Sequence, residues 1–163
     1  MKIVSAFALQ PRHRQLLENA APGAELIDGQ CSSPRQVLEL AAGGCDVIMT
    51  FFVPDDLLKV APKLQWIQLF SAGADHMSKG PLAGGAVTVT TTSGVHAASM
   101  AEFALTMMLM HAHRFNVTSR AQFHHKWINA IEFMSTADQL RGKTAGIIGY
   151  GSIGRATARL ASA

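Results

Sequence analysis

The chain has 163 residues, which is enough for one ordinary domain and part of another. Its net charge of +3 at pH 7 is mild, and its Lys and Arg residues are scattered, so neither nucleic acid nor a membrane surface is indicated as a partner. Cys31 and Cys45 lack the spacing of a metal site or a redox pair, which favours two reduced thiols in a cytoplasmic protein.

The first part of the chain alternates between strand and helix signals. Strands are predicted over 2–9, 25–28, 46–53, 64–70 and 87–92, with helices over 12–20 and beginning at Ser33-Pro34 and at Pro54. The first of these strands is apolar, but it is short and lacks a convincing cleavage site, so a signal peptide is not indicated and the cytoplasm is the expected location. The alternation predicts an α/β fold, a flavodoxin- or Rossmann-like parallel sheet with helices on both faces.

Ligands of parallel sheets bind beyond the carboxyl ends of the strands, which makes the loops 51–55, 71–75 and 92–94 candidates. The loop 71–75, Ser-Ala-Gly-Ala-Asp, places small residues directly after a buried strand. Such a loop leaves backbone N–H groups free to bind a carboxylate or a phosphate. An ordinary strand-to-helix turn with Asp75 as the helix N-cap explains the same residues, and spacing alone favours this simpler interpretation.

Residues 95–114 predict a long helix that is apolar on nearly every side. Glu102 and Thr106 are the only polar side chains between Met100 and Met110, so burial on several sides is expected. The stretch is too short to span a bilayer, and its methionines are expected to be packing material and not a metal or haem site.

A further helix is predicted through Trp127, followed by a loop to Leu140. The histidines do not indicate a metal site. His111 and His113 diverge on a helix because they are two residues apart, and no histidine pair in the chain has metal-ligand spacing.

Lys143–Arg155 is typical of a phosphate-binding turn, with a strand predicted over 144–148, a Gly-x-Gly-x-x-Gly turn over 149–154 and the first turn of a helix after it. In this pattern Gly149 makes the turn, Gly151 lets the backbone approach a pyrophosphate, and Gly154 lets helix and strand pack closely. N–H groups at the helix start would hold the anion. The segment 144–163 amounts to one strand and about half a helix. It has no neighbouring strand, so it is expected to be ordered only by the 95–114 helix, a second chain or another partner.

Four stretches together resemble the D-isomer-specific 2-hydroxyacid dehydrogenase family, with features of its glyoxylate/hydroxypyruvate reductase branch. They are LQWIQLFSAGADHM (64–77), TSGVHAASMAEFALTMMLMHAHR (92–114), the segment around Trp127, and LRGKTAGIIGYGSIGRATAR (140–159). The resemblance implies an NAD(P)-dependent oxidoreductase that acts on the CH–OH group of 2-hydroxy acids, with its active site between two α/β lobes. It assigns 1–93 to the substrate-side lobe, 94–141 to crossover and dimerisation helices, and 142–163 to the start of the NAD(P)-binding domain.

The resemblance also assigns residues to sites. It makes the loop of Ala72, Gly73 and Ala74 the holder of the substrate carboxylate, which now becomes the favoured interpretation of that loop. It gives the pyrophosphate of NAD or NADP to Gly149, Tyr150, Gly151, Ser152, Ile153, Gly154 and Arg155. It implies a homodimer formed through the 95–114 helix.

Family enzymes carry a catalytic Arg, Glu and His well after the glycine-rich turn, and this sequence ends before all three. His96, His111 and His113 cannot replace them because they belong to the crossover helix, so no catalytic residue is assigned. The chain is therefore interpreted as the N-terminal portion of a truncated enzyme, inactive alone, with weak or no dinucleotide binding. The alternative is a non-catalytic dimeric binding or regulatory module that retains only the small-carboxylate loop.

Overall fold

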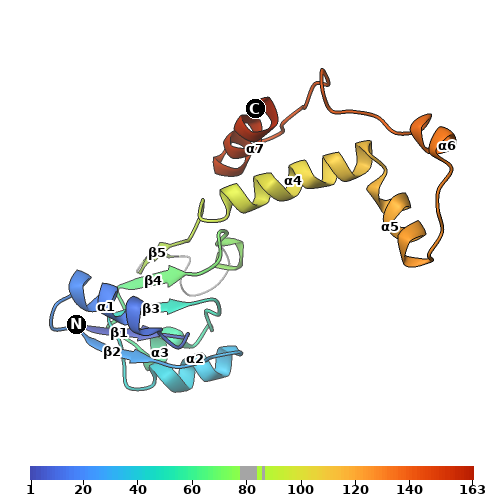
Figure 1. Ribbon diagram of the computed structural model, residues 1–163. Helices are drawn as coiled ribbons and strands as arrows, with labels where there is room; N and C mark the ends of the chain where they lie inside the picture. The colour runs from blue at the N-terminus through green and yellow to red at the C-terminus, as the bar shows by residue number, and fades with distance from the viewer. Residues whose placement is uncertain (78–83, 86) are drawn as a thin grey trace. The chain divides into compact units, whose positions relative to one another are not determined.

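Short stretches rich in apolar and β-branched residues form a parallel sheet in the first part of the chain. The strands are β1 (Lys2–Ser5), β2 (Glu25–Asp28), β3 (Val47–Thr50), β4 (Trp66–Leu69) and β5 (Thr88–Thr90). They lie in the order β2-β1-β3-β4-β5, and all neighbours are parallel (Figure 1). The predicted α/β class and parallel sheet are confirmed.

The computed structural model describes residues 1–77, 84–85 and 87–163. These residues form two units, Met1–Ser93 and Gly94–Ala163. The sheet belongs to the first unit.

Three helices and one 3-10 turn complete the described part of the first unit. They are α1 (Pro11–Ala20), α2 (Pro34–Ala41), α3 (Leu57–Val60) and η1 (Asp75–Met77). Helix α2 begins as predicted, because Ser33 Oγ accepts a hydrogen bond from the Gln36 N–H at 3.4 Å and Pro34 occupies the first turn. Helix α3 is a single turn, since Pro62 has no N–H with which to extend it.

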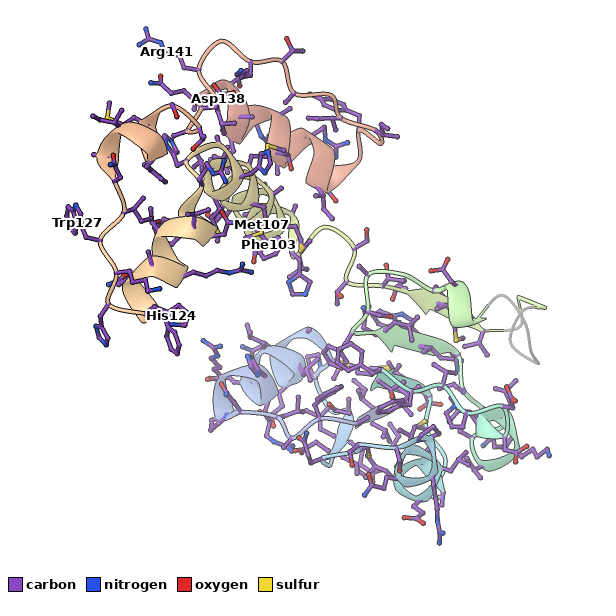
Figure 2. The ribbon with its side chains drawn as sticks, turned by 90° about the vertical axis from the view of Figure 1, so that its right-hand side faces the viewer. Phe103, Met107, His124, Trp127, Asp138 and Arg141 are labelled. Atoms are coloured by element: carbon purple, nitrogen blue, oxygen red, sulfur yellow. The ribbon has the colours of Figure 1, made fainter. Side chains whose placement is uncertain are left out.

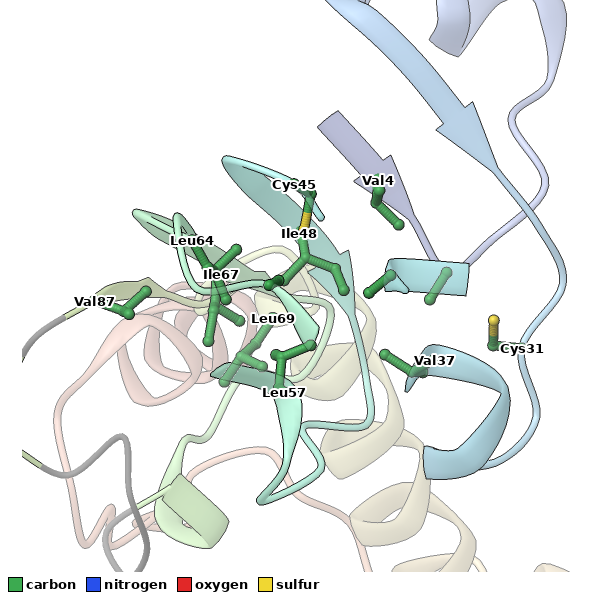
Figure 3. Close-up of a cluster of buried hydrophobic side chains, with 13 residues drawn as sticks. Val4, Cys31, Val37, Cys45, Ile48, Leu57, Leu64, Ile67, Leu69 and Val87 are labelled. Atoms are coloured by element: carbon green, nitrogen blue, oxygen red, sulfur yellow. The ribbon is translucent and has the colours of Figure 1, made fainter. Parts of the chain in front are cut away.

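The core of the first unit follows one row of side chains across the sheet. The strand register aligns Val4 with Ile48 and Ile48 with Ile67, and all three are fully buried. Val37 of α2 and Leu57 of α3 belong to the same cluster, so these two helices cover this face (Figure 3).

The opposite face is covered less completely. Strand β2 lies on one side of β1 and β3 on the other, so the connections through α1 and through α2 run in opposite directions across the sheet. Because both connections are right-handed, α1 and α2 lie on opposite faces. None of α1's residues, all of them described, is buried. Trp66, on the α1 side of the sheet by alternation, is 42% exposed.

Strands β1 and β3 end four and three residues earlier than the sequence predicted, and a hydroxyl group is the cause in both. Ser5 Oγ donates to the Phe7 carbonyl at 2.8 Å and accepts from the Phe7 N–H at 3.3 Å. Thr50 Oγ1 forms the same pair of bonds with Phe52, at 2.9 and 3.0 Å. Each hydroxyl bonds to the backbone N–H and carbonyl groups that would otherwise pair with a neighbouring strand, so the backbone turns away from the sheet.

The described second unit consists of helices and loops. The helices are α4 (Ala97–Ala112), α5 (Phe115–Phe123), α6 (Ala130–Met134) and α7 (Ser152–Ser162). Helix α4 is the predicted apolar helix, and it packs against α7 and α5. The segment after the glycine turn is thus ordered by α4, one of the possibilities that the sequence left open.

Three expectations for this unit are wrong. Residues 144–148 form no strand, because the described second unit holds no other strand to pair with them, and Ile148 is fully exposed. Helix α7 has 11 residues and is therefore not the half helix expected. Trp127 lies in the loop between α5 and α6, 97% exposed, because His125 adopts a left-handed φ of 52° that stops α5.

The expected burial of α4 on several sides is also not found within the chain. Ala101 and Ala112 are its only buried residues within the described structure, whereas Phe103 is 59% and Met107 42% exposed (Figure 2). Several methionines of α4 are therefore partly exposed to solvent. The expectation that an apolar helix is buried on several sides is not met within this single chain.

Candidate functional site

The strand order locates a ligand crevice in the first unit. In a sheet of order β2-β1-β3-β4-β5, the direction of strand addition reverses between β1 and β3. The crossover helices on either side of this point lie on opposite faces, so a gap opens beyond the carboxyl ends of the two strands. The segments that follow β1, β3 and β4 line this edge, among them the loop 71–75.

Hydrogen bonds to its neighbours hold the loop 71–75 in place. Ser71 Oγ donates to the Gly73 carbonyl at 2.8 Å, and the Thr92 N–H donates to the Ser71 carbonyl at 3.1 Å. The Thr92 hydroxyl adds a bond to the Phe70 carbonyl at 2.7 Å. The loop is therefore tied to the end of β4 at one side and to the segment after β5 at the other.

The N–H groups of this loop are available to an anion. Among the described residues, no acceptor takes up the N–H of Ala72, Gly73 or Ala74, and the first two of these residues are exposed. Asp75 is the first residue of η1 and not its N-cap, because the Ala74 carbonyl accepts the Met77 N–H at 2.8 Å. A carboxylate could accept two or more of the free N–H groups, which is the chemistry expected of these residues.

Three phenylalanine rings gather at the same edge, one after each of the strands β1, β3 and β4. Phe7 lies edge-on to Phe70 with ring centres 4.6 Å apart, and to Phe51 at 5.3 Å. Phe51 and Phe70 are 5.8 Å apart. We call these residues the aromatic cluster. Its edge-to-face geometry is favourable for aromatic pairs.

A pocket of about 600 Å³ opens next to the aromatic cluster. It is lined by Pro34, Phe51, Phe52, Val53 and Ser71. The pocket therefore joins an apolar wall to the first residue of the loop 71–75. Sequence reasoning named the loop after β3 but missed its aromatic wall, although a phenylalanine within two residues of three strand ends was a visible signal.

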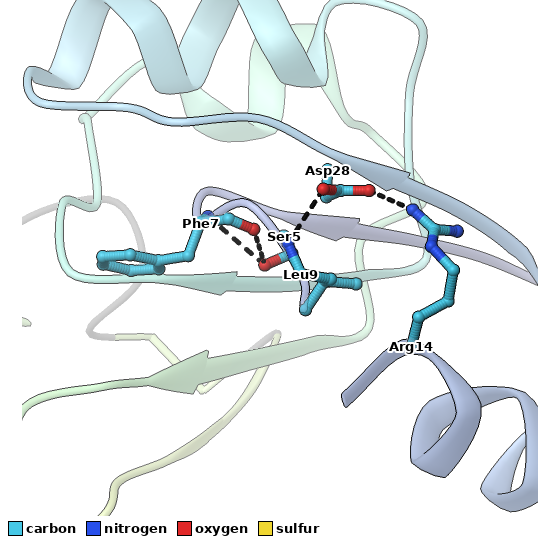
Figure 4. Close-up of polar contacts among 5 residues, drawn as sticks. All are labelled: Ser5, Phe7, Leu9, Arg14 and Asp28. Atoms are coloured by element: carbon cyan, nitrogen blue, oxygen red, sulfur yellow. Dashed lines mark hydrogen bonds and ion pairs between the residues drawn. The ribbon is translucent and has the colours of Figure 1, made fainter. Parts of the chain in front are cut away.

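One cation near the end of β2, Arg14, is already paired with a carboxylate. Asp28 Oδ2 accepts the Leu9 N–H at 2.9 Å, and Asp28 Oδ1 forms an ion pair with Arg14 of α1 (Figure 4). This contact fastens the segment after β1 to β2 and α1. It also engages the Arg14 guanidinium, so that group is not free to bind a ligand.

The glycine-rich turn of the second unit has the backbone features expected from its glycine spacing. Gly149 has a φ of 92°, a conformation that L side chains rarely adopt. A Cβ on Gly154 would lie 2.2 Å from the Gly149 carbonyl oxygen, so only glycine allows α7 to approach the turn this closely. A Cβ on Gly151 would have no described atom within 4 Å, which leaves the space above this residue open.

The start of α7 completes this turn. Gly151 is the N-cap, and no described side chain caps the helix, so the N–H groups of Ser152, Ile153 and Gly154 are open to an anion. The Arg155 guanidinium donates to the Tyr150 carbonyl at 3.1 Å, which holds a positive charge beside the turn. These residues fit the pyrophosphate of a dinucleotide.

The histidines of the described second unit discussed for catalysis belong to α4 and its two ends. His96 precedes α4, while His111 and His113 lie at its far end. No group of three His, Cys, Asp or Glu side chains gathers anywhere in the described residues. Burial raises the pKa of Cys45 to about 11 and also raises that of Cys31, so both thiols are protonated and poorly nucleophilic at neutral pH.

The described helices include none that combines the length and apolarity needed to cross a membrane.

Known proteins resemble this chain in sequence and in fold. Residues 105–163 match the model of the D-isomer specific 2-hydroxyacid dehydrogenase NAD binding domain. Over 135 residues the chain is 30% identical to a glyoxylate reductase of Thermococcus gammatolerans, covering 78% of this chain and 40% of the relative. It is 29% identical over 136 residues to an erythronate-4-phosphate dehydrogenase of Shewanella sp. (strain MR-7), covering 82% of this chain and 29% of the relative.

Among solved structures, the chain is similar to the NAD-dependent formate dehydrogenase of Staphylococcus aureus in complex with NAD. The sequence identity is 25% and the TM-score 0.67, and the match covers 98% of this chain and 53% of the other. The chain thus spans less than half the length of the two curated relatives and about half of the solved one.

Two glycine substitutions should distinguish Gly154, which packs closely against the turn, from Gly151, which has open space beside it. Gly154→Ala is expected to destabilise the packing of α7 by about 1–3 kcal/mol, because the new methyl group overlaps the Gly149 carbonyl. The matched variant Gly151→Ala should cost no more than about 1 kcal/mol, because Ala is a poorer N-cap than Gly but its methyl group would meet no described atom. Urea unfolding followed by far-ultraviolet circular dichroism measures both, and equal effects would contradict the close approach of α7 to the turn.

Proposed function

We propose that this chain, which belongs to the D-isomer-specific 2-hydroxyacid dehydrogenase family, forms part of an oxidoreductase that interconverts a 2-hydroxy acid and its 2-keto acid with NAD or NADP. The observation that carries the proposal is the glycine-rich turn. Its Gly149 with positive φ, open Gly151 and uncapped helix start are suited to a pyrophosphate, and they lie within the segment that matches the family's NAD binding domain. A nicotinamide cofactor held there would supply or accept the hydride.

The chain's own residues bind and orient the two reactants. Gly149–Arg155 would hold the cofactor pyrophosphate through the backbone N–H groups of Ser152, Ile153 and Gly154. Ala72, Gly73 and Ala74 would hold the substrate carboxylate through theirs, which leaves the carbonyl carbon free to react. The substrate is a small 2-keto or 2-hydroxy acid, as the name of the glyoxylate reductase relative suggests. We place the reaction in the cytoplasm, in keeping with the reduced state of Cys31 and Cys45.

The loop 71–75 provides the direct test of substrate binding. Titration of the 163-residue chain with millimolar pyruvate or glyoxylate should shift the amide NMR signals of Ala72, Gly73 and Ala74, because a carboxylate would accept their N–H groups. Gly23 and Gly44 serve as internal controls, since they lie in turns that precede strands and so belong to the opposite edge of the sheet. Unchanged signals in the loop, or equal shifts at the control glycines, would refute the substrate assignment.

The isolated chain of 163 residues should not turn over. It carries the two binding segments but none of the proton-transfer residues that the family resemblance implies. With NADH or NADPH and glyoxylate, hydroxypyruvate or pyruvate, we expect no cofactor oxidation near the enzymatic rate of about 1 per second or more, measured by absorbance. A rate in that range would show that the chain contains a catalytic group we have not identified.

The exposed surface of α4 supports a homodimer. Phe103 and Met107 stand on a helix whose buried residues are only Ala101 and Ala112 within the described structure, and exposed apolar surface of this kind marks protein interfaces (Figure 2). We expect light scattering at micromolar concentration to give twice the chain mass of 17.4 kDa.

Phe103→Asp should convert this dimer to a monomer, because it places a charge in the apolar contact. Leu16→Asp is the matched control, since Leu16 is equally apolar and 66% exposed but lies on α1 of the first unit. A wild-type monomer, or equal loss of the dimer in both variants, would exclude α4 as the interface.

A further inference from the structure

We infer that the first unit selects 2-keto acids with an apolar, uncharged side chain, such as 4-methyl-2-oxopentanoate, over both the smallest acids and phosphorylated ones. The inference rests on the proposed function, because it concerns the side chain of an acid whose carboxylate is held by the loop 71–75. The relatives do not decide this point, since one is named for glyoxylate and another for erythronate-4-phosphate. The evidence lies in the pocket beside that loop.

The pocket places an apolar wall within reach of the carboxylate loop. Ser71 is both the first residue of the loop and a lining residue of the pocket of about 600 Å³, and Phe51, Phe52 and Val53 line the same pocket. Phe51 is 45% exposed although it contacts two other rings, so part of its face is open to the pocket. An acid held at Ala72–Ala74 would therefore direct its side chain toward Phe51.

Hydrogen bonds from side-chain hydroxyls to the backbone hold the apolar wall in place. The Thr50 hydroxyl bonds to both the N–H and the carbonyl of Phe52, which turns the backbone immediately after β3. The Ser5 hydroxyl does the same at Phe7, and the Phe7 ring packs edge-on against Phe51 with ring centres 5.3 Å apart. A pre-formed apolar surface favours an apolar ligand because little entropy is lost in ordering it.

The carboxyl edge of the sheet has no free cation in the segments that directly follow its strands. Those segments, which contain no Lys or Arg, are 6–10, 29–33, 51–56, 70–74 and 91–93. Arg14, in the first half of α1, is paired with Asp28, and none of the residues that line the pocket is a cation. A phosphate dianion in this pocket would therefore find no cationic partner among its lining residues, which should weaken its binding.

The test is a comparison of three acids on the wild-type chain by amide NMR titration. We expect 4-methyl-2-oxopentanoate to bind roughly tenfold more tightly than pyruvate, because each buried methylene is worth about fourfold and the pocket is only partly closed. Phosphohydroxypyruvate should bind more weakly than pyruvate. Pyruvate binding as tightly as the branched acid, or a preference for the phosphorylated acid, would overturn the inference and leave the proposed function standing. Failure of all three acids to shift the loop would overturn both.

A pair of variants assigns the preference to the aromatic wall. Phe51→Ser should abolish the affinity difference between 4-methyl-2-oxopentanoate and pyruvate, whereas Phe51→Leu should retain most of it. Phe123→Ser is the matched control, because Phe123 is 82% exposed on α5, and it should leave the preference as in the wild type. An unchanged preference in folded Phe51→Ser would exclude the wall, and the comparison on the wild-type chain decides the inference even if that variant fails to fold.

Discussion

The buried row that crosses the sheet is the constraint on which the first unit depends. Val4, Ile48 and Ile67 occupy matching register positions and are completely shielded from water under α2 and α3. A slip of one residue in any of these strands would turn its apolar side chains to the opposite face, at a cost of several kcal/mol for the three side chains. The row therefore aligns the carboxyl ends of β1, β3 and β4, and every feature of the candidate substrate site lies just beyond them.

Hydroxyl groups convert those aligned strand ends into a binding edge. Ser5, Thr50, Ser71 and Thr92 each follow or end a strand, and each bonds to a backbone group that the sheet no longer satisfies. Because these bonds are local, the backbone can leave the sheet without exposing unpaired polar groups to the apolar cluster. The chain then presents aromatic rings and free N–H groups side by side, which is an arrangement suited to an acid with an apolar side chain.

The second unit shows a different relation between sequence and structure. The glycine-rich turn depends only on neighbouring residues, and it keeps the conformation that its sequence predicts even though the preceding strand is absent. A strand needs a partner to exchange hydrogen bonds, whereas Gly149, Gly151 and Gly154 act through local backbone geometry and close approach. The helix that follows finds its support on α4.

The sequence by itself determined the features that depend on local chemistry. Periodicity predicted the α/β class and all five strands of the sheet, Ser33-Pro34 predicted the start of α2, and the glycine spacing predicted the tight turn before α7. Only the tertiary structure decided what depends on partners distant in the chain. It shows no strand at 144–148, leaves Trp127 and much of α4 exposed, and brings Phe7, Phe51 and Phe70 together. Hydrogen bonding between strands, burial and ring contact depend on how segments lie in space and not on their sequence alone.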